Sequence, residues 1–277
     1  PDIIHIWLPA IFHVYFLPGL FFPAKRILGV RNVYKLENLK RYLHLFIYFI
    51  CKNVVSNTHI QDQNGWFKKV YSNKNYFFIP NAIKFDVNPP KRENLVNNNN
   101  TKQLLFIGRL VNQKNIINLI EAFSAIEKQN WELKIIGEGY LRQALEQKIN
   151  TLELSHKINF IVFSIQIEKY YKKADALILP SFTEGMPNVV FEAASFQNML
   201  LLSDIPQHRR WFTHRQNALL FNPHDKEDIK SNIVKFLDMD VNECYNYSLN
   251  AFEIIKKLSK DAYVRKYAKM YNQIHGK

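Results

Sequence analysis

The sequence predicts an α/β protein of two domains, the second of which is a doubly wound parallel sheet. At 277 residues, the chain is long enough for two domains of modest size. From residue 103 onward, short apolar runs alternate with helical patterns, as in repeated β-α units. The stretch after Lys114 carries apolar residues at helical spacing, which is typical of a helix packed on a sheet. The strands expected in this domain are 104–107, 133–136, 158–163, 176–179, 199–202 and 218–221.

The first part of the chain, residues 1–83, also alternates between apolar runs and helical patterns. A membrane-spanning helix needs roughly 20 apolar residues with an intact backbone hydrogen-bond ladder, and residues 8–24 are almost entirely apolar. Because Pro9, Pro18 and Pro23 interrupt this run, we expect a buried or membrane-facing helix pair instead. The strands expected here are 3–6, 26–30, 53–56 and 76–79, with helices over 41–51 and around 65–70.

Composition separates the two parts of the chain. Residues 84–102 are rich in Pro, Asn and charged side chains, with an unbroken Asn run at 97–100. Such a composition predicts a flexible loop at the domain junction. The second domain then covers 103–258, and 259–277 forms a helical tail.

The polar loop at 181–188 is the main candidate site. It follows the apolar run 176–179 and precedes a predicted helix over 189–198, and ligands of open parallel sheets bind at the carboxyl ends of strands. Gly185 leaves room for a ligand to approach the backbone, and the helix start behind Asn188 is expected to offer free N–H groups to an anion. Glu184 lies in the loop, and we expect Glu192 on the first helical turn.

Two carboxylates beside an anion site suit a ligand that is part phosphate and part polyol, because carboxylates accept hydrogen bonds from sugar hydroxyls. The alternative is structural. In that interpretation Glu192 only favours the positive end of its helix, and Glu184 is a solvated loop residue.

The spacing Glu184-x7-Glu192 within EGMPNVVFEA, followed by SDIP, resembles the signature loop of the retaining glycosyltransferases of family 4, within the group 1 glycosyl transferases. That family has the GT-B fold of two Rossmann-like domains. The resemblance implies that Glu184 approaches the hydroxyls of the donor sugar and that Glu192 holds the ribose. The backbone expected to contact the donor diphosphate is that of Gly185, Met186, Pro187 and Asn188.

Two cations follow the first strand of the second domain, within GRLVNQKN. A planar guanidinium at Arg109 and a mobile ammonium at Lys114 can together neutralise a diphosphate as it departs. From this segment alone, they could equally be solvated loop cations. The resemblance implies that both lie against the donor diphosphate, with Gly108 beside them.

The segment GEGYLR follows the next strand and opens a helix, which resembles a dinucleotide-binding turn. Only Gly-x-Gly is present, and Arg142 stands at the place of the third glycine. We therefore do not expect a nicotinamide-dependent dehydrogenase. The family resemblance implies a structural turn near the nucleotide, with Gly137 at the donor site.

Two further positions depart from the family's pattern. Phe163 and Ser164 match residues that contact the base, but Val162 stands where the family has glycine. His5 matches the first of two histidines, whereas Trp7 occupies the second position. We retain Phe163 as a donor-binding candidate and His5 as a catalytic candidate, with a structural role as the alternative for His5.

Charge and cysteine content limit the partners and the compartment. The formal net charge of +13 suits a nucleotide sugar, a phospholipid surface or nucleic acid, but no nucleic-acid motif is present. We therefore expect no nucleic-acid partner. Cys51 and Cys244 give no disulfide framework, which indicates a reducing compartment. We therefore expect a cytoplasmic protein. Aromatic residues near Lys25 and Arg26 favour contact with the inner face of the cell membrane, and burial of these residues within the first domain is the alternative. These aromatic residues are Phe12, Tyr15, Phe16, Phe21 and Phe22.

The resemblance implies a retaining hexosyl- or N-acetylhexosaminyl-transferase. It would move a sugar from a nucleoside diphosphate to a glycan or lipid-linked acceptor in cell-surface polysaccharide or lipopolysaccharide synthesis. We expect no cofactor and no metal ion. The family normally has about two more β-α units before the segment that matches residues 1–5, so residues 1–83 resemble an incomplete acceptor-side domain to which 259–277 crosses back. A catalytically inactive nucleotide-sugar-binding remnant is the alternative.

Overall fold

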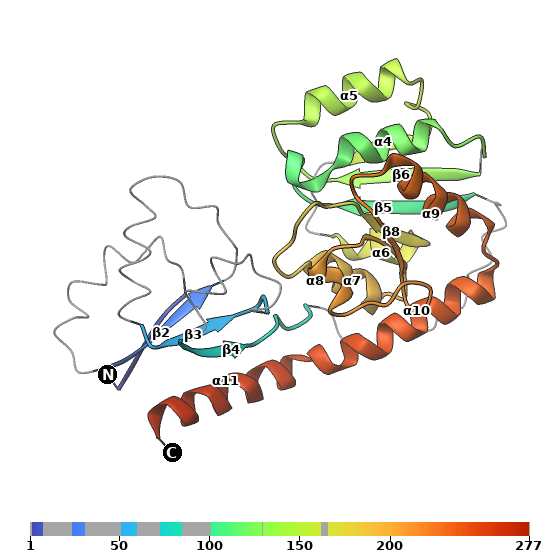
Figure 1. The fold of residues 1–277 in the computed structure, drawn as a ribbon. Helices are drawn as coiled ribbons and strands as arrows, with labels where there is room; N and C mark the ends of the chain where they lie inside the picture. Colours follow the sequence, from blue (N-terminus) through green and yellow to red (C-terminus); the bar gives the residue numbers. More distant parts are fainter. Residues whose placement is uncertain are drawn as a thin grey trace. The chain divides into compact units, whose positions relative to one another are not determined.

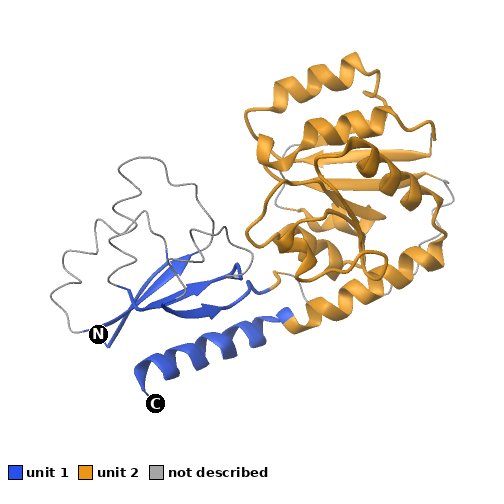
Figure 2. Cartoon of the chain, in the orientation of Figure 1, with its two compact units in different colours: residues 1–82, 258–277 blue, residues 83–257 orange. Residues whose placement is uncertain are grey.

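The computed structural model describes residues 2–7, 24–30, 51–59, 73–84, 101–128, 130–161 and 166–276. The chain divides into two compact units, which Figure 2 draws in blue and orange. Unit 1 comprises residues 1–82 and 258–277, and unit 2 comprises residues 83–257. Each unit is built on a parallel sheet, so the predicted α/β class is confirmed.

The sheet of unit 1 has four strands in the order β1-β2-β3-β4. The two inner strands, β2 and β3, are buried from Ile27 to Val30 and from Asn53 to Ser56, as expected for inner strands of a parallel sheet. Lys25 at the start of β2 donates to the Ile274 carbonyl at 2.7 Å, and this contact ties the sheet to the carboxyl-terminal helix of the same unit. The strands are β1 Ile3–Ile6, β2 Lys25–Val30, β3 Asn53–Ser56 and β4 Asn75–Phe78.

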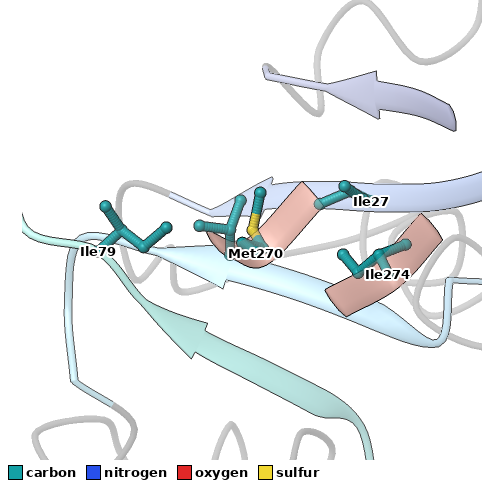
Figure 3. Close-up of a cluster of buried hydrophobic side chains, with 5 residues drawn as sticks. Ile27, Ile79, Met270 and Ile274 are labelled. Carbon is teal, nitrogen blue, oxygen red and sulfur yellow. The ribbon is translucent and has the colours of Figure 1, made fainter. Parts of the chain in front are cut away.

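The helix α11, Lys260–His275, completes unit 1. Its first turn is capped by the Ser259 hydroxyl, which accepts from the Ala262 N–H. Met270 and Ile274 are one turn apart and point into a buried apolar cluster with the strand residues (Figure 3). The strand side of this cluster is formed by Ile27, Val55 and Ile79. The tail of the chain is therefore part of the first unit's core.

The sheet of unit 2 has six parallel strands in the order β10-β9-β8-β5-β6-β7. From β5, the chain builds outward to β7 on one side, then returns to β8 and builds outward to β10 on the other. This is the doubly wound order. Helices α4 and α5 lie on one side of the sheet, and α6 and α7 lie on the other (Figure 1). The strands are β5 Lys102–Ile107, β6 Trp131–Ile136, β7 Ile158–Ile161, β8 Ala176–Leu179, β9 Met199–Ser203 and β10 Leu219–Phe221.

The helices of unit 2 connect and cover these strands. Helix α9 is capped by Asp225 and α10 by Asp240, whose side chains accept from backbone N–H groups of the first turn. The α-helices are α4 Ile116–Ser124, α5 Arg142–Thr151, α6 Glu168–Lys173, α7 Asn188–Ser195, α8 Pro206–Arg209, α9 Lys226–Asp238 and α10 Val241–Ile255. The 3₁₀ helices are η3 Asn112–Lys114 and η4 Lys256–Leu258.

The structure corrects the bounds of the helix that follows the candidate loop. We predicted 189–198, whereas α7 begins at Asn188 and ends at Ser195. Gln197 adopts a left-handed conformation with φ of 57°, which stops the helix before β9. The Asn198 N–H then donates to the Ala193 carbonyl at 3.0 Å and closes the turn. The prediction was wrong here because glutamine gives little signal for a left-handed residue.

Other predictions fall partly outside the described residues. β7 is described to Ile161, so the predicted strand positions 162 and 163 are not covered. The aromatic residues expected at a membrane surface lie in 8–23, which is also outside the described ranges. Across the ranges that are described, no helix combines the length and the apolar character needed to cross a bilayer.

Candidate functional site

The strand order of unit 2 reverses between β5 and β8, so the loops that leave these two strands diverge at one edge of the sheet. Ligands of open α/β sheets bind in the crevice between such loops. The β5 loop carries Lys114, and the β8 loop carries Glu184. The Lys114 Nζ lies 2.5 Å from the Glu184 Oε1, and the two side chains are only 11% and 8% exposed. A largely buried ion pair therefore occupies the switch point.

Backbone and amide hydrogen bonds hold the two loops in register. The Phe182 N–H donates to the Gln113 carbonyl at 3.0 Å, and the Gln113 amide donates to the Thr183 carbonyl at 2.7 Å. Lys114 and Glu184 are thus brought together by loops that contact each other along several residues. The ion pair is part of a fixed arrangement rather than a chance surface contact.

Lys114 is positioned by a short 3₁₀ turn. Asn115 adopts a left-handed conformation with φ of 55° between η3 and α4, which asparagine tolerates better than most residues. Its side-chain amide donates to the Pro223 carbonyl at 2.7 Å. The stem of Lys114 passes over Gly108, where an added Cβ would lie 3.4 Å from the Lys114 Cε. Gly108 therefore lies directly beside the lysine side chain.

Arg109 lies on the same loop as Lys114, but its side chain is exposed. It makes no ion pair with any residue in the described ranges. Its guanidinium is thus available at the rim of the switch point, whereas the ammonium of Lys114 is already engaged by a carboxylate.

The Gly-x-Gly turn is explained by close backbone packing against the β5 loop. The Gly108 N–H donates to the Ile136 carbonyl, and the Leu110 N–H donates to the Glu138 carbonyl, at 3.0 and 2.8 Å. A Cβ at Gly137 would lie 1.8 Å from the Gly108 carbonyl oxygen. One at Gly139 would lie 2.3 Å from the Leu110 carbonyl oxygen. Because Gly137 has no side chain, the backbone of the β5 loop can pack closely against it.

We expect Gly137→Ala to lower the stability of unit 2 by about 3 kcal/mol or more, because the new Cβ overlaps a backbone oxygen that cannot move without distorting β5. The melting transition measured by calorimetry reports this loss. Gly276→Ala is the matched control, since Gly276 also has positive φ but no heavy atom within 4 Å of the added Cβ. The control is expected to cost only about 1 kcal/mol. Equal losses in the two variants would contradict the packing explanation.

Glu192 is held by a buried tyrosine from the neighbouring helix α6. The Tyr171 hydroxyl donates to the Glu192 Oε2 at 2.8 Å, and the Tyr171 ring stacks on Phe196 at 5.4 Å between centroids. Burial raises the pKa of Glu192, while the Tyr171 hydrogen bond and the charge of Lys84 lower it. The expected position on the first helical turn is wrong: because α7 begins at Asn188, Glu192 begins the second turn.

The start of α7 also has fewer free backbone N–H groups than we predicted. The Asn188 N–H donates to the Met186 carbonyl and the Val190 N–H donates to the Pro187 carbonyl, each at 2.9 Å. These two groups are used inside the loop because Pro187 folds the chain back just before the helix. The prediction that the helix start offers free N–H groups is therefore wrong for Asn188 and Val190. Gly185 and Met186 are half-buried in the same loop.

The sequence interpretation missed His208, which lies in α8 just after the SDIP segment. His208 is fully buried, and its Nδ1 donates to the Ser203 carbonyl at 2.7 Å. Burial is the main cause of its lowered pKa, and the charge of Glu184 acts in the opposite direction. The Ser203 hydroxyl donates to the Ser181 carbonyl at 2.6 Å. The neutral imidazole of His208 and the hydroxyl of Ser203 thus support the loop that carries Glu184.

Of the two remaining predicted site residues, one belongs to unit 1 and the other is not described. His5 belongs to β1 in unit 1, where its Nδ1 lies 2.7 Å from the Tyr271 hydroxyl. Phe163 falls outside the described residues, as do Val162 and Ser164. Unit 2 therefore brings Lys114 and Glu184 into contact beside Gly108, leaves Arg109 exposed on the same loop as Lys114, and places Glu192 on the following helix.

The family model for glycosyl transferases group 1 matches residues 87–254. The chain is 28% identical over 162 residues to the amylovoran biosynthesis glycosyltransferase AmsD of Erwinia amylovora, a match that covers 56% of this chain and 44% of that protein. It is also 25% identical over 276 residues to UDP-Gal:alpha-D-GlcNAc-diphosphoundecaprenol alpha-1,3-galactosyltransferase of Escherichia coli. That match covers 92% of this chain and 69% of the Escherichia coli protein.

The fold is similar to that of sucrose-phosphate synthase from Thermosynechococcus elongatus. The TM-score is 0.85 at 17% identity, over 99% of this chain and 74% of that one. The GT-B type expected from the resemblance is confirmed. The chain spans less than half the length of the Erwinia amylovora relative.

Proposed function

Because the chain belongs to the group 1 glycosyl transferases, we propose that it moves a sugar from a nucleoside-diphosphate donor to a hydroxyl of a glycan or lipid-linked acceptor. Two relatives support the choice of substrates. The Erwinia amylovora protein is named for amylovoran biosynthesis, and the name of the Escherichia coli protein gives UDP-Gal as donor and a diphosphoundecaprenol-linked sugar as acceptor. We place this chain in the same class of reaction, with a hexose or N-acetylhexosamine as the transferred sugar.

The observation that carries this proposal is the Lys114–Glu184 pair at the switch point. An incoming diphosphate offers Lys114 a stronger partner than one carboxylate, because its negative charge is larger and is spread over several oxygens. As Lys114 turns to the diphosphate, Glu184 becomes free to accept hydrogen bonds from the donor sugar. The pair thus holds a phosphate-binding group and a sugar-binding group within one salt-bridge distance.

The proposed reaction retains the configuration at the anomeric carbon. The bond from that carbon to the diphosphate oxygen breaks, and the acceptor oxygen bonds to the carbon on the same face. The acceptor proton passes to the departing phosphate oxygen, so no enzyme nucleophile is required. Lys114 and Arg109 stabilise the growing negative charge of the leaving diphosphate, and we propose that they do so without a divalent ion.

Glu192 is assigned to the ribose of the donor in this proposal. The Tyr171 hydroxyl fixes one carboxylate oxygen, which leaves the other oxygen to accept ribose hydroxyls. Since α7 follows directly after the Glu184 loop, one short segment would contact both sugars of the donor. This arrangement predicts that free nucleoside diphosphate and donor sugar compete for the same site.

We expect a nucleoside diphosphate to raise the melting temperature of the chain in the presence of a chelator, because a ligand at about 100 times its Kd stabilises by about 2.7 kcal/mol. Screening UDP, GDP and ADP by thermal shift tests this and identifies the base. Arg109→Ala is expected to weaken binding about tenfold or more through loss of a charge-assisted contact.

Lys230 on α9 provides a control, since its side chain is half-buried and pairs locally with Glu227 on the same helix. Lys230→Ala should leave the nucleotide affinity unchanged. Loss of all binding on chelation would contradict the metal-independent site. Equal affinity in the Arg109→Ala variant and the unchanged protein would contradict the role of Arg109.

A further inference from the structure

The loop that carries Glu184 is fixed from two directions. On one side, Gln113 forms hydrogen bonds with the residues directly before Glu184. On the other side, the Ser203 hydroxyl donates to the Ser181 carbonyl at 2.6 Å. Gln113 shares the short helix η3 with Lys114, whereas Ser203 comes from β9. The contact from Ser203 is therefore independent of the loop that carries Lys114.

Ser203 is held by the sheet itself. It is the last residue of β9, it is fully buried, and it pairs with Phe221 of β10. The Ile205 N–H donates to the Ser203 carbonyl at 2.9 Å, and the next residue, Asp204, donates its N–H to the Phe221 carbonyl at 2.6 Å. A hydroxyl on a paired strand can set the position of a neighbouring loop more precisely than a residue of another loop can.

The imidazole of His208 sets the direction of the Ser203 hydroxyl. The His208 Nδ1 lies 2.7 Å from the Ser203 carbonyl oxygen and 3.3 Å from the Ser203 Oγ. Because a carbonyl oxygen only accepts, Nδ1 carries the proton of the neutral ring. This N–H faces a lone pair of the Ser203 Oγ, so the hydroxyl hydrogen is directed away from the ring. It is then free to bond the Ser181 carbonyl.

The other ring nitrogen favours the neutral form of His208. The residue is fully buried, and its Nε2 has no hydrogen-bond partner among the described residues. A proton on Nε2 would therefore bury an unpaired N–H. Burial is the main cause of the lowered pKa of His208, the charge of Lys114 lowers it further, and the charges of Glu184 and Asp204 oppose this. The same burial keeps the ring away from a substrate, so its effect on the reaction is indirect.

We propose that His208 and Ser203 are positioning residues for Glu184 during sugar transfer. This role rests on the proposed function, in which the diphosphate takes Lys114 away from Glu184. Glu184 then loses the cation that holds its carboxylate, and Gln113 belongs to the loop that responds to the diphosphate. The Ser203 hydroxyl still fixes the backbone before Glu184 and keeps the carboxylate directed at the donor sugar. Such control matters because a misplacement of about 1 Å can cost about 10²-fold in rate.

The main test compares two buried serines. The Ser248 hydroxyl on α10 donates to the Tyr245 carbonyl at 2.8 Å, and Ser248 is 3% exposed, so Ser248→Ala is a matched control for Ser203→Ala. Both variants should lower the melting temperature by a similar amount, about 2–4 °C. Only Ser203→Ala should lower kcat, by about tenfold or more, while the nucleotide affinity stays unchanged. Equal kcat in the two variants would overturn the inference.

A double-mutant cycle shows whether Ser203 acts through Glu184. In a Glu184→Gln background, Ser203→Ala should lower kcat by less than about twofold further, because the carboxylate that it positions is already missing. A further loss as large as in the unchanged background would show that Ser203 acts on another group, and the role assigned to it would be wrong.

His208 is tested with two substitutions. His208→Asn keeps an N–H at the position of Nδ1, whereas His208→Leu removes it. We expect kcat to stay within about threefold in His208→Asn and to fall about tenfold in His208→Leu. Long-range ¹H–¹⁵N NMR of the full chain gives a readout that does not depend on activity. At pH 6.5, the ordinary pKa of histidine, it should show the neutral Nδ1–H tautomer of His208. An Nε2–H tautomer, an imidazolium, or equal kcat in the two variants would contradict the role of His208.

Failure of the proposed function has a different outcome. If the unchanged chain releases no nucleoside diphosphate from UDP-, GDP- or ADP-sugars, the proposed reaction is wrong, and the positioning role is wrong with it. If the unchanged chain uses one of these donors and Ser203→Ala uses it equally fast, only the positioning role is wrong.

Discussion

Lys114→Met is expected to abolish measurable binding of nucleoside diphosphate and to lower the stability of unit 2 by about 3–5 kcal/mol. Two effects coincide at this residue. The ammonium is the cation proposed to meet the diphosphate, and it is also the partner of Glu184, whose side chain is only 8% exposed. Removing the lysine leaves a largely buried carboxylate without a counter-ion. Calorimetric melting measures the stability, and isothermal titration with nucleotide measures the binding.

A second substitution separates these two effects. In Lys114→Met combined with Glu184→Gln, both charges are removed, and most of the lost stability should return because no unpaired charge remains. Nucleotide binding should not return, since the cation is still missing. Lys128→Met is the matched control, because the pair of Lys128 with Asp238 is 40% and 56% exposed and contributes at most about 1 kcal/mol. Recovery of nucleotide binding in the double variant would contradict the assignment of Lys114 to the diphosphate.

The strands of unit 2 could be predicted because their signal is local. The run at 176–179 is continuously apolar and bounded by polar segments, and it coincides with β8. The order of the strands has no such local signal. Strands β5 and β8 pair although some 70 residues separate them, and this pairing is what brings Lys114 to Glu184. The sequence predicted that each residue follows a strand, but their contact depends on the topology.

The residues that were missed act through burial. Tyr171 was not singled out from the sequence, yet its ring is fully buried and its hydroxyl fixes Glu192. His208 could have been noticed as a histidine two residues after SDIP, at the carboxyl edge of β9. Neither environment can be read from spacing, because burial depends on side chains that are distant in the sequence. The Gly-x-Gly turn shows the same limit, since only the structure reveals the carbonyl groups that exclude a Cβ.

The two glutamates are expected to fail differently when each is changed to glutamine. Glu192→Gln should weaken donor and free nucleotide alike, by about tenfold to a hundredfold, because ribose is present in both. Glu184→Gln should lower kcat by roughly 10²–10³ while leaving nucleotide affinity nearly intact, because a contact that strengthens in the transition state appears in kcat. Isothermal titration with nucleoside diphosphate measures the nucleotide affinity. The rate at which nucleoside diphosphate is released from the donor sugar measures kcat. Equal losses of nucleotide affinity in both variants would contradict the separate roles.

The pH dependence of stability gives a second readout that only Glu192 should change. Burial raises the pKa of Glu192 in the folded chain above its ordinary value of 4.5, so between 4.5 and the raised pKa the folded state binds more protons than the unfolded state. Stability from this group is therefore fully present below pH 4.5 and is lost as the pH rises through the folded pKa.

Glu192→Gln cannot titrate, and it keeps an oxygen that can accept from the Tyr171 hydroxyl. The variant should lack this loss and gain stability relative to the unchanged chain near neutral pH, as measured by melting temperature across pH 4–8. Tyr171→Phe should have the opposite effect near neutral pH, because the half-buried carboxylate of Glu192 then loses its hydrogen-bond donor. A pH profile that is unchanged in Glu192→Gln would show that this carboxylate is solvated, and the ribose assignment would lose its structural basis.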